Sequence, residues 1–282
     1  VDLQQFLQKY TASPTRKEFE KLRNMPQHNS NFSVNEKWLA ARSHVITGSK
    51  ISGFVGMAYG SKNRKKNKQN FMKKEIWPEK RYINSIYTWH GTIHEECAEL
   101  ALYDILNHQV ESGSIKSFEI DNPGLILGNQ RCFGYSADGV LKIEMPNGEI
   151  ETHLCEYKCP YSKRNQDHFD DSPMYGPLTY PLEHGNGESG SANITKYYYC
   201  QIQYGMGLLK ERGILQASNL SCYFVTWTFG HVYYKRIPFD EGFYRWMKNE
   251  AYDTYVNVYA PSVIKKKHHV LQYGEIHQHI ST

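Results

Sequence analysis

Apolar side chains recur at helical spacing between residues 97 and 105, and polar residues separate them. At 100° per residue they form one stripe, which predicts that residues 82–107 are largely helical. The stripe consists of Cys97, Ala98, Ala101, Leu102 and Ile105.

A different pattern follows at residues 140–157, where two runs of β-prone residues flank Pro146-Asn147-Gly148. Asn-Gly between two such runs is a strong signal for a β-hairpin. Side chains alternate across a strand. Glu156 and Lys158 are therefore predicted on one face, and their neighbours Cys155, Tyr157 and Cys159 on the other.

The rest of the chain is divided by turn-forming and charged residues. The predicted elements are a helix-compatible segment over 1–30, a helix from a capping box at Ser33 and Glu36 through Trp38 to Arg42, a helix from Ser49 to about Tyr59, a basic loop over 60–75, a sheet over roughly 116–160, a long mobile loop over 161–193, a helix over 195–212, strands near 220–237 and a final helix near 240–258.

Charge and cysteine usage narrow the class of protein. The net charge is only +4, but basic residues concentrate at 62–68. Such a run either contacts a polyanion such as DNA or is a solvated loop or localisation signal; Arg64, Lys65 and Lys66 are the candidate contacts. The six cysteines show no Cys-x-x-Cys spacing, and no apolar run reaches the roughly 20 residues that span a bilayer. We expect a soluble intracellular protein of the cytoplasm or nucleus, without a membrane partner.

The predicted hairpin places acidic groups close together. Asp138 precedes the first strand, and strand pairing brings it towards Glu156. Two carboxylates on a rigid sheet suit one or two Mg²⁺ or Mn²⁺ ions, and Lys158 beside a cation can position a water or stabilise charge on a phosphate. The combination indicates phosphodiester hydrolysis. Taken singly, Asp-Gly is more often a turn and Glu-x-Lys a solvated strand face.

The helix stripe indicates a third acid. Glu95 projects at the edge of the stripe, where a carboxylate needs a cation or donor, whereas Glu96 and Glu99 are expected to face solvent. His94 lies in the middle of the stripe and is predicted to be packed and hydrogen-bonded rather than a ligand.

A second group of residues could bind an anion. Arg42, Thr47 and Ser49 combine a guanidinium, hydroxyl groups and the backbone N–H groups of a helix start, which together suit a phosphate. The alternative is an ordinary N-cap at Ser49.

Asp138 followed by Glu156-x-Lys158 resembles the core of the PD-(D/E)xK nuclease superfamily. More narrowly, Ser136-Ala-Asp-Gly139 and Glu156-Tyr-Lys-Cys-Pro160 resemble the lambda exonuclease/YqaJ viral recombinase family. Three further segments follow the family's order, so that the resemblance covers roughly residues 38–230. They are Arg42-Ser-His-Val-Ile-Thr-Gly-Ser49, Trp89-His-Gly-Thr-Ile-His-Glu95 and Tyr197-Tyr-Tyr-Cys-Gln201-Ile-Gln203.

The resemblance implies an α/β (α+β) fold with a restriction-endonuclease-like core, a mixed central sheet flanked by helices. It also implies roles for single residues. Asp138, Glu156, the Tyr157 carbonyl and Glu95 would hold the metal, Lys158 and Gln201 would place the attacking water, Ser136 would touch the cleaved phosphate, and Arg42 and Ser49 would hold a terminal 5′-phosphate.

The implied activity is a Mg²⁺-dependent exonuclease that digests one strand of linear duplex DNA 5′→3′ and leaves single strands for recombination or repair. Its partners would be double-stranded DNA ends, preferably with a 5′-phosphate, and a single-strand annealing protein. The 18-residue spacing from Asp138 to Glu156 and the long 161–193 segment depart from the family, so both a trimer and a monomer stay open. Rival functions are an endonuclease or RNase on the same fold and a non-catalytic DNA-binding recombination protein.

Candidate residues from 42 to 201 would serve one site, which predicts a single nuclease domain over 1–282. Within it we expect an N-terminal helical extension over 1–32, a catalytic core over 33–237, and a C-terminal helix and tail over 238–282.

Overall fold

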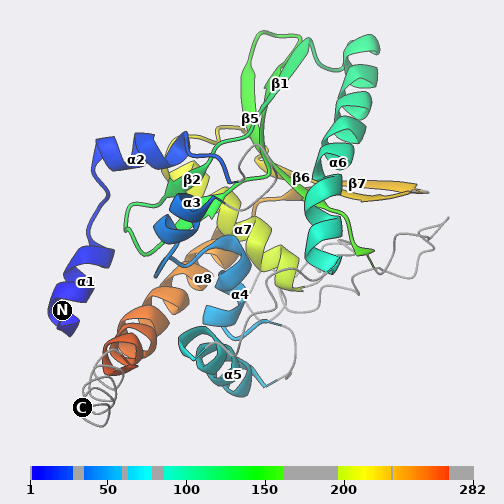
Figure 1. The fold of residues 1–282 in the computed structure, drawn as a ribbon. Helices are drawn as coiled ribbons and strands as arrows, with labels where there is room; N and C mark the ends of the chain where they lie inside the picture. The colour runs from blue at the N-terminus through cyan, green and yellow to red at the C-terminus, as the bar shows by residue number, and fades with distance from the viewer. Residues whose placement is uncertain are drawn as a thin grey trace.

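The computed structural model describes residues 2–27, 35–58, 63–77, 86–161, 196–229 and 231–266. Along the described chain a run of helices is followed by a run of strands, and then by one helix, two strands and a final helix (Figure 1). In chain order they are α1 Leu3–Thr11, α2 Arg16–Arg23, α3 Glu36–Ala41, α4 Gly48–Phe54, α5 Arg64–Ile76, α6 Ile86–Glu111, β1 Ser117–Asp121, β2 Leu125–Leu127, β3 Gly134–Ser136, β4 Gly139–Glu144, β5 Ile150–Lys158, α7 Lys196–Glu211, β6 Ser221–Thr228, β7 His231–Pro238, α8 Glu241–Thr254 and the π-helical turn η3 Tyr255–Tyr259.

The central sheet has five strands in the order β1-β4-β5-β6-β7. β5 and β6 run parallel and the other neighbours antiparallel, so the sheet is mixed. β4 and β5 form the predicted hairpin, in which Gly139 pairs with Cys155 and Glu144 with Ile150. Gly148 in its turn has φ +84°, a conformation that glycine adopts at little cost. β2 and β3 form a separate two-stranded sheet.

Helix α6 covers one face of the central sheet (Figure 1). Its buried Ala98 and Leu102 belong to the same hydrophobic cluster as Cys155, Tyr157 and Tyr223 of β5 and β6. The predicted alternation along β5 is confirmed, because Cys155 and Tyr157 face this helix.

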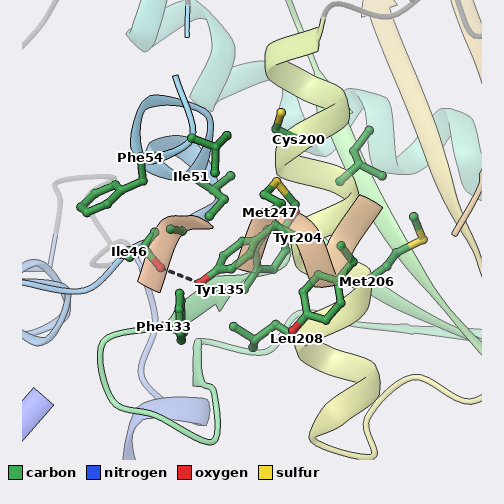
Figure 2. Packing of buried hydrophobic residues seen from close by; sticks show 14 of the residues in the cluster. Ile46, Ile51, Phe54, Phe133, Tyr135, Cys200, Tyr204, Met206, Leu208 and Met247 are labelled. Carbon is green, nitrogen blue, oxygen red and sulfur yellow. Dashed lines mark hydrogen bonds between the residues drawn. The ribbon is translucent and has the colours of Figure 1, made fainter. Parts of the chain in front are cut away.

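Helices α7, α4 and α8 form the other, larger hydrophobic cluster (Figure 2). Tyr135 of β3 lies at its centre, and a Cβ atom at Gly48 or Gly205 would come within 2.5 Å and 2.4 Å of its ring. Tyr204 of α7 donates a hydrogen bond to the Ile46 carbonyl at 2.7 Å. These contacts bring α4, β3 and α7 together.

Most predicted elements are present, but the basic segment 60–75 was wrongly predicted as a loop. Residues 64–76 form α5, because the Asn63 side chain caps its first turn by accepting from the Lys66 N–H at 3.0 Å. Met72 and Ile76 bury one side of the helix. The many lysines in this segment suggested a solvated loop, although its apolar residues are spaced as in a helix.

Two element ends also differ from the prediction, and one predicted loop is not tested. The N-cap of α3 is Asn35, and Ser33 lies outside the described residues. α4 ends at Phe54, several residues early. Nearly all of the predicted loop 161–193 lies outside the described residues. No helix in the described ranges is long and apolar enough to cross a membrane.

Candidate active site

The structure brings the two carboxylates and the lysine of the hairpin motif together. Asp138 lies between β3 and β4, and its Oδ2 accepts a hydrogen bond from the Tyr157 N–H at 2.8 Å. The Nζ of Lys158 contacts Glu156 Oε1 and lies 4.0 Å from Asp138 Oδ2. Strand pairing accounts for this geometry, because the Gly139–Cys155 register sets the preceding Asp138 beside Glu156.

Glu156 is fully buried and held by three donors. The Tyr135 hydroxyl donates to Oε2 at 2.6 Å, while Gln201 Nε2 and Lys158 Nζ both contact Oε1. Gln203 is turned away, since it donates to the Pro238 carbonyl and accepts from the Asp240 N–H.

Sequence reasoning missed Tyr135. It is one of 22 tyrosines, and nothing in its motif distinguishes it from a core residue. Alternation along β3 would have indicated only that Tyr135 and Ser136 point to opposite sides.

Glu95 reaches the same region from α6. Burial raises its pKa to about 7, the charge of Lys158 lowers it and that of Glu156 raises it. Glu96 is exposed as predicted, whereas Glu99 is half-buried. The Nδ1–H of His94 donates to the His90 carbonyl at 2.8 Å and its ring stacks on Trp227, so this histidine is packed, as predicted.

The electrostatics of this acidic cluster, Glu95, Asp138, Glu156 and Lys158, favour a bound cation. Burial raises the pKa of Asp138 well above its usual range, and the nearby Glu156 raises it further. Burial lowers the pKa of Lys158, but Glu156 and Asp138 outweigh this and raise it. Three carboxylates face one ammonium, and a divalent ion would offset the excess negative charge.

The donors therefore fit Mg²⁺ or Mn²⁺ in chemistry and charge, since all are hard oxygens. Among the residues that the structure describes, no three His, Cys, Asp or Glu side chains already surround a point that could hold a metal ion. The Lys158 ammonium instead contacts Glu156 directly.

A pocket of about 490 Å³ opens beside the acidic cluster. Glu95, Ser136 and Asp138 line it together with Trp38 and Arg23. The Ser136 Oγ is buried and makes no hydrogen bond, so it is available to a ligand. A polar pocket bordered by carboxylates suits a substrate that is bound through a metal ion.

The predicted phosphate-binding residues are Arg42, Thr47 and Ser49. They lie on both sides of His44, which has a strained backbone conformation. The Arg42 guanidinium lies over the Trp38 ring at 4.0 Å, and burial lowers its pKa to about 10. Thr47, not Ser49, is the N-cap of α4, and their hydroxyl groups are 3.2 Å apart. The α4 start is close to Gln201, because a Cβ at Gly48 would lie 3.1 Å from its Cγ.

His44 lies in the loop between α3 and α4, and its backbone has the uncommon φ of 61°. Tyr255 donates to its carbonyl at 2.9 Å, and Tyr259 Oη lies 3.0 Å from its Nδ1. Both tyrosines belong to the π-helical turn, a feature that often accompanies functional sites. The C-terminal helix thus fixes the loop that carries Arg42.

The basic run is not part of the acidic cluster. Arg64 donates to the Val55 carbonyl, lies over the Trp246 ring at 4.8 Å and is 3.7 Å from Glu250, so it joins α5 to α8. Lys65 and Lys66 are exposed on α5.

Comparison with known proteins gives a matching family and similar solved structures. The family model described as "YqaJ-like viral recombinase domain" matches residues 37–208. The crystal structure of an alkaline exonuclease from Laribacter hongkongensis is similar, with a TM-score of 0.51, 21% identity, and 84% of this chain and 100% of that chain covered. The same enzyme in complex with dAMP gives a TM-score of 0.52 with the same identity and coverage. No match was found among curated proteins. The structural likeness confirms the predicted fold, a mixed sheet flanked by helices.

Proposed function

Because the chain belongs to the YqaJ-like viral recombinase domain family, we propose that it is a metal-dependent exodeoxyribonuclease that digests one strand of linear duplex DNA from 5′ to 3′. The family and the alkaline exonuclease fold support a nuclease that acts on DNA in recombination. The observation that supports metal-dependent hydrolysis is the buried Glu156, which is surrounded by Asp138, Lys158 and Gln201.

In this proposal Asp138, Glu156, Glu95 and the Tyr157 carbonyl hold one or two Mg²⁺ or Mn²⁺ ions. The chemistry supplied there is a more acidic water and stabilisation of the negative charge of the transition state. The fixed Glu156 carboxylate is the anchor, because its donors come from three different elements.

Lys158 and Gln201 act on the nucleophile. Lys158 Nζ lies between the two motif carboxylates. As an ammonium it would orient a water, and it would take the proton of the water only as a neutral amine, a form that a metal cation nearby would favour. Gln201 holds Glu156 Oε1 and restricts the direction of the carboxylate.

Ser136 and Arg42 act on the substrate. The Ser136 hydroxyl, which lines the pocket without a partner, would donate to the cleaved phosphate. Arg42, with Thr47 and Ser49, would bind the terminal 5′-phosphate, which would give the enzyme a preference for phosphorylated ends.

The test is digestion of a linear duplex with 5′-phosphate or 5′-hydroxyl ends, and of a covalently closed circle, in Mg²⁺ or in EDTA. We expect digestion of the linear duplex only in Mg²⁺, faster from the 5′-phosphate, and an intact circle. The Asp138→Ala variant should bind duplex ends without cutting them, because removal of a carboxylate reduces repulsion of the phosphates. Near-normal digestion by this variant would refute the assignment, and cleavage of the circle would favour an endonuclease.

A further inference from the structure

Helices α1 and α2 lie outside the family match but are joined to the rest of the protein (Figure 1). Arg131 is the main link. Its Nε donates to both carboxylate oxygens of Glu18 in α2, at 2.9 Å and 3.0 Å, and its Nη1 donates to the Lys9 carbonyl in α1 at 3.0 Å. In addition, the Cys132 N–H donates to the Tyr10 carbonyl at 2.6 Å.

Between these helices, α3 and β2 lies a groove of about 430 Å³. Its floor is apolar, since Leu22, Val45 and Leu127 belong to one small hydrophobic cluster. Its charged lining consists of Lys9, Lys21, Lys37, Arg131 and Glu18.

The charge of this basic groove is unbalanced. Four cations face one carboxylate, and Glu18 is already paired with Arg131. Within the described ranges, neither Lys21 nor Lys37 has a carboxylate within ion-pairing distance, and both are exposed. An anionic ligand would balance this charge.

The basic groove is next to the pocket that Glu95 and Asp138 line. Met25 lines both. Lys37 lines the groove and its neighbour Trp38 lines the pocket, so α3 separates the two. A polyanion whose end enters the pocket would run past these lysines.

We propose that the basic groove binds the phosphodiester backbone of the DNA whose end occupies the candidate active site. This inference rests on the proposed function. Duplex DNA carries one negative charge per roughly 1.7 Å of its axis, so adjacent lysines can each neutralise a phosphate. The N-terminal helices, absent from the family match, thereby extend the DNA contact surface of this chain.

The test compares two double variants of the full chain. Lys21→Gln with Lys37→Gln removes two groove charges, and Lys17→Gln with Lys73→Gln removes two exposed lysines that do not line the groove. Affinity for a labelled 5′-phosphorylated duplex is measured in EDTA over a series of salt concentrations.

We expect the groove variant to bind roughly tenfold more weakly at moderate salt, with the slope of log affinity against log salt reduced by about 1.8, because two phosphate contacts are lost. The control variant should keep the wild-type slope. Equal slopes in wild type and groove variant would overturn the proposal. So would a groove variant that loses affinity for polyglutamate but keeps its affinity for DNA, since the groove would then serve an acidic protein.

The experiment distinguishes refutation of DNA binding by the basic groove from refutation of the proposed nuclease function. If wild-type protein digests linear DNA and the groove variant has the wild-type salt dependence of DNA affinity, only DNA binding by the groove is refuted. If wild-type protein neither binds nor digests DNA, both the groove proposal and the proposed function are refuted. Thermal unfolding of each variant tests whether the fold is retained, as we expect, since Lys→Gln changes at exposed positions usually have little effect on stability.

Discussion

At the scale of single residues, Glu156 illustrates how burial makes a carboxylate useful. A fully buried carboxylate needs donors or a cation. Tyr135, Gln201 and Lys158 supply donors from β3, α7 and β5. Tyr135 itself is held by the close approach of Gly48 and Gly205. The orientation of the carboxylate thus depends on side chains from three different elements.

Tyr135→Phe tests this dependence. It keeps the ring but leaves Glu156 Oε2 without its donor, which should reduce the free energy of unfolding by about 1–3 kcal/mol and slow DNA digestion. Denaturant unfolding and digestion of a linear duplex measure the two effects.

Tyr204→Phe is the matched control. It also loses hydrogen bonds of a buried hydroxyl, to Ile46 and Gly134, but none to the acidic cluster. If both variants lose activity in proportion to stability, Tyr135 has no specific role in positioning Glu156.

At the scale of elements, α2 is attached by charge as well as by packing. Leu22 is buried, and the Glu18–Arg131 pair joins α2 to the loop before β3. The hydrogen bond from Arg131 lowers the pKa of Glu18 below its ordinary value of 4.5. The ionised form is therefore favoured in the folded state.

Stability should consequently depend on pH through Glu18. Because its pKa is lower in the folded state, its contribution is fully present above about pH 4.5 and is lost as pH falls through the folded-state value. Glu18→Gln should reduce the free energy of unfolding at pH 7 by about 1 kcal/mol, a modest value because the pair is partly exposed.

Denaturant unfolding at pH 7 and pH 3 measures this effect, and the difference from wild type should shrink at pH 3. Glu20→Gln removes the exposed pair with Arg16 in the same helix and should have little effect at either pH. A Glu18→Gln deficit that stays constant with pH would contradict the linkage.

At the scale of the whole molecule, the N-terminal helices share the core of the sheet domain. Phe6 of α1 is buried in the main hydrophobic cluster, with its ring centroid 5.1 Å from that of His44 and 6.4 Å from that of Tyr255. Residues near both ends of the described chain therefore pack against the loop that carries Arg42. We propose on this basis that the chain forms one domain.

Phe6→Ala should reduce the free energy of unfolding by about 3–5 kcal/mol, because it leaves a cavity in that cluster. Denaturant unfolding followed by tryptophan fluorescence should show one transition at lower denaturant. Gln8→Ala, an exposed change in the same helix, is the control. A separate early transition with the main one unchanged would show that α1 is not part of this core.

Local patterns along the chain were sufficient to predict the hairpin, the alternation of β5 and the position of Glu95 on its helix. They succeed because strand and helix periodicity is fixed by backbone geometry over a few residues. The same reasoning failed for α5, where capping by Asn63 and burial of Met72 override a run of charges.

The sequence by itself thus determined most of the elements, α5 excepted, and which residues could carry the chemistry. Only the tertiary structure decided that Tyr135 supports Glu156, that Arg64 joins two helices, and that a basic groove lies beside the acidic pocket. These facts depend on contacts between segments far apart in the chain, and local periodicity carries no information about such contacts.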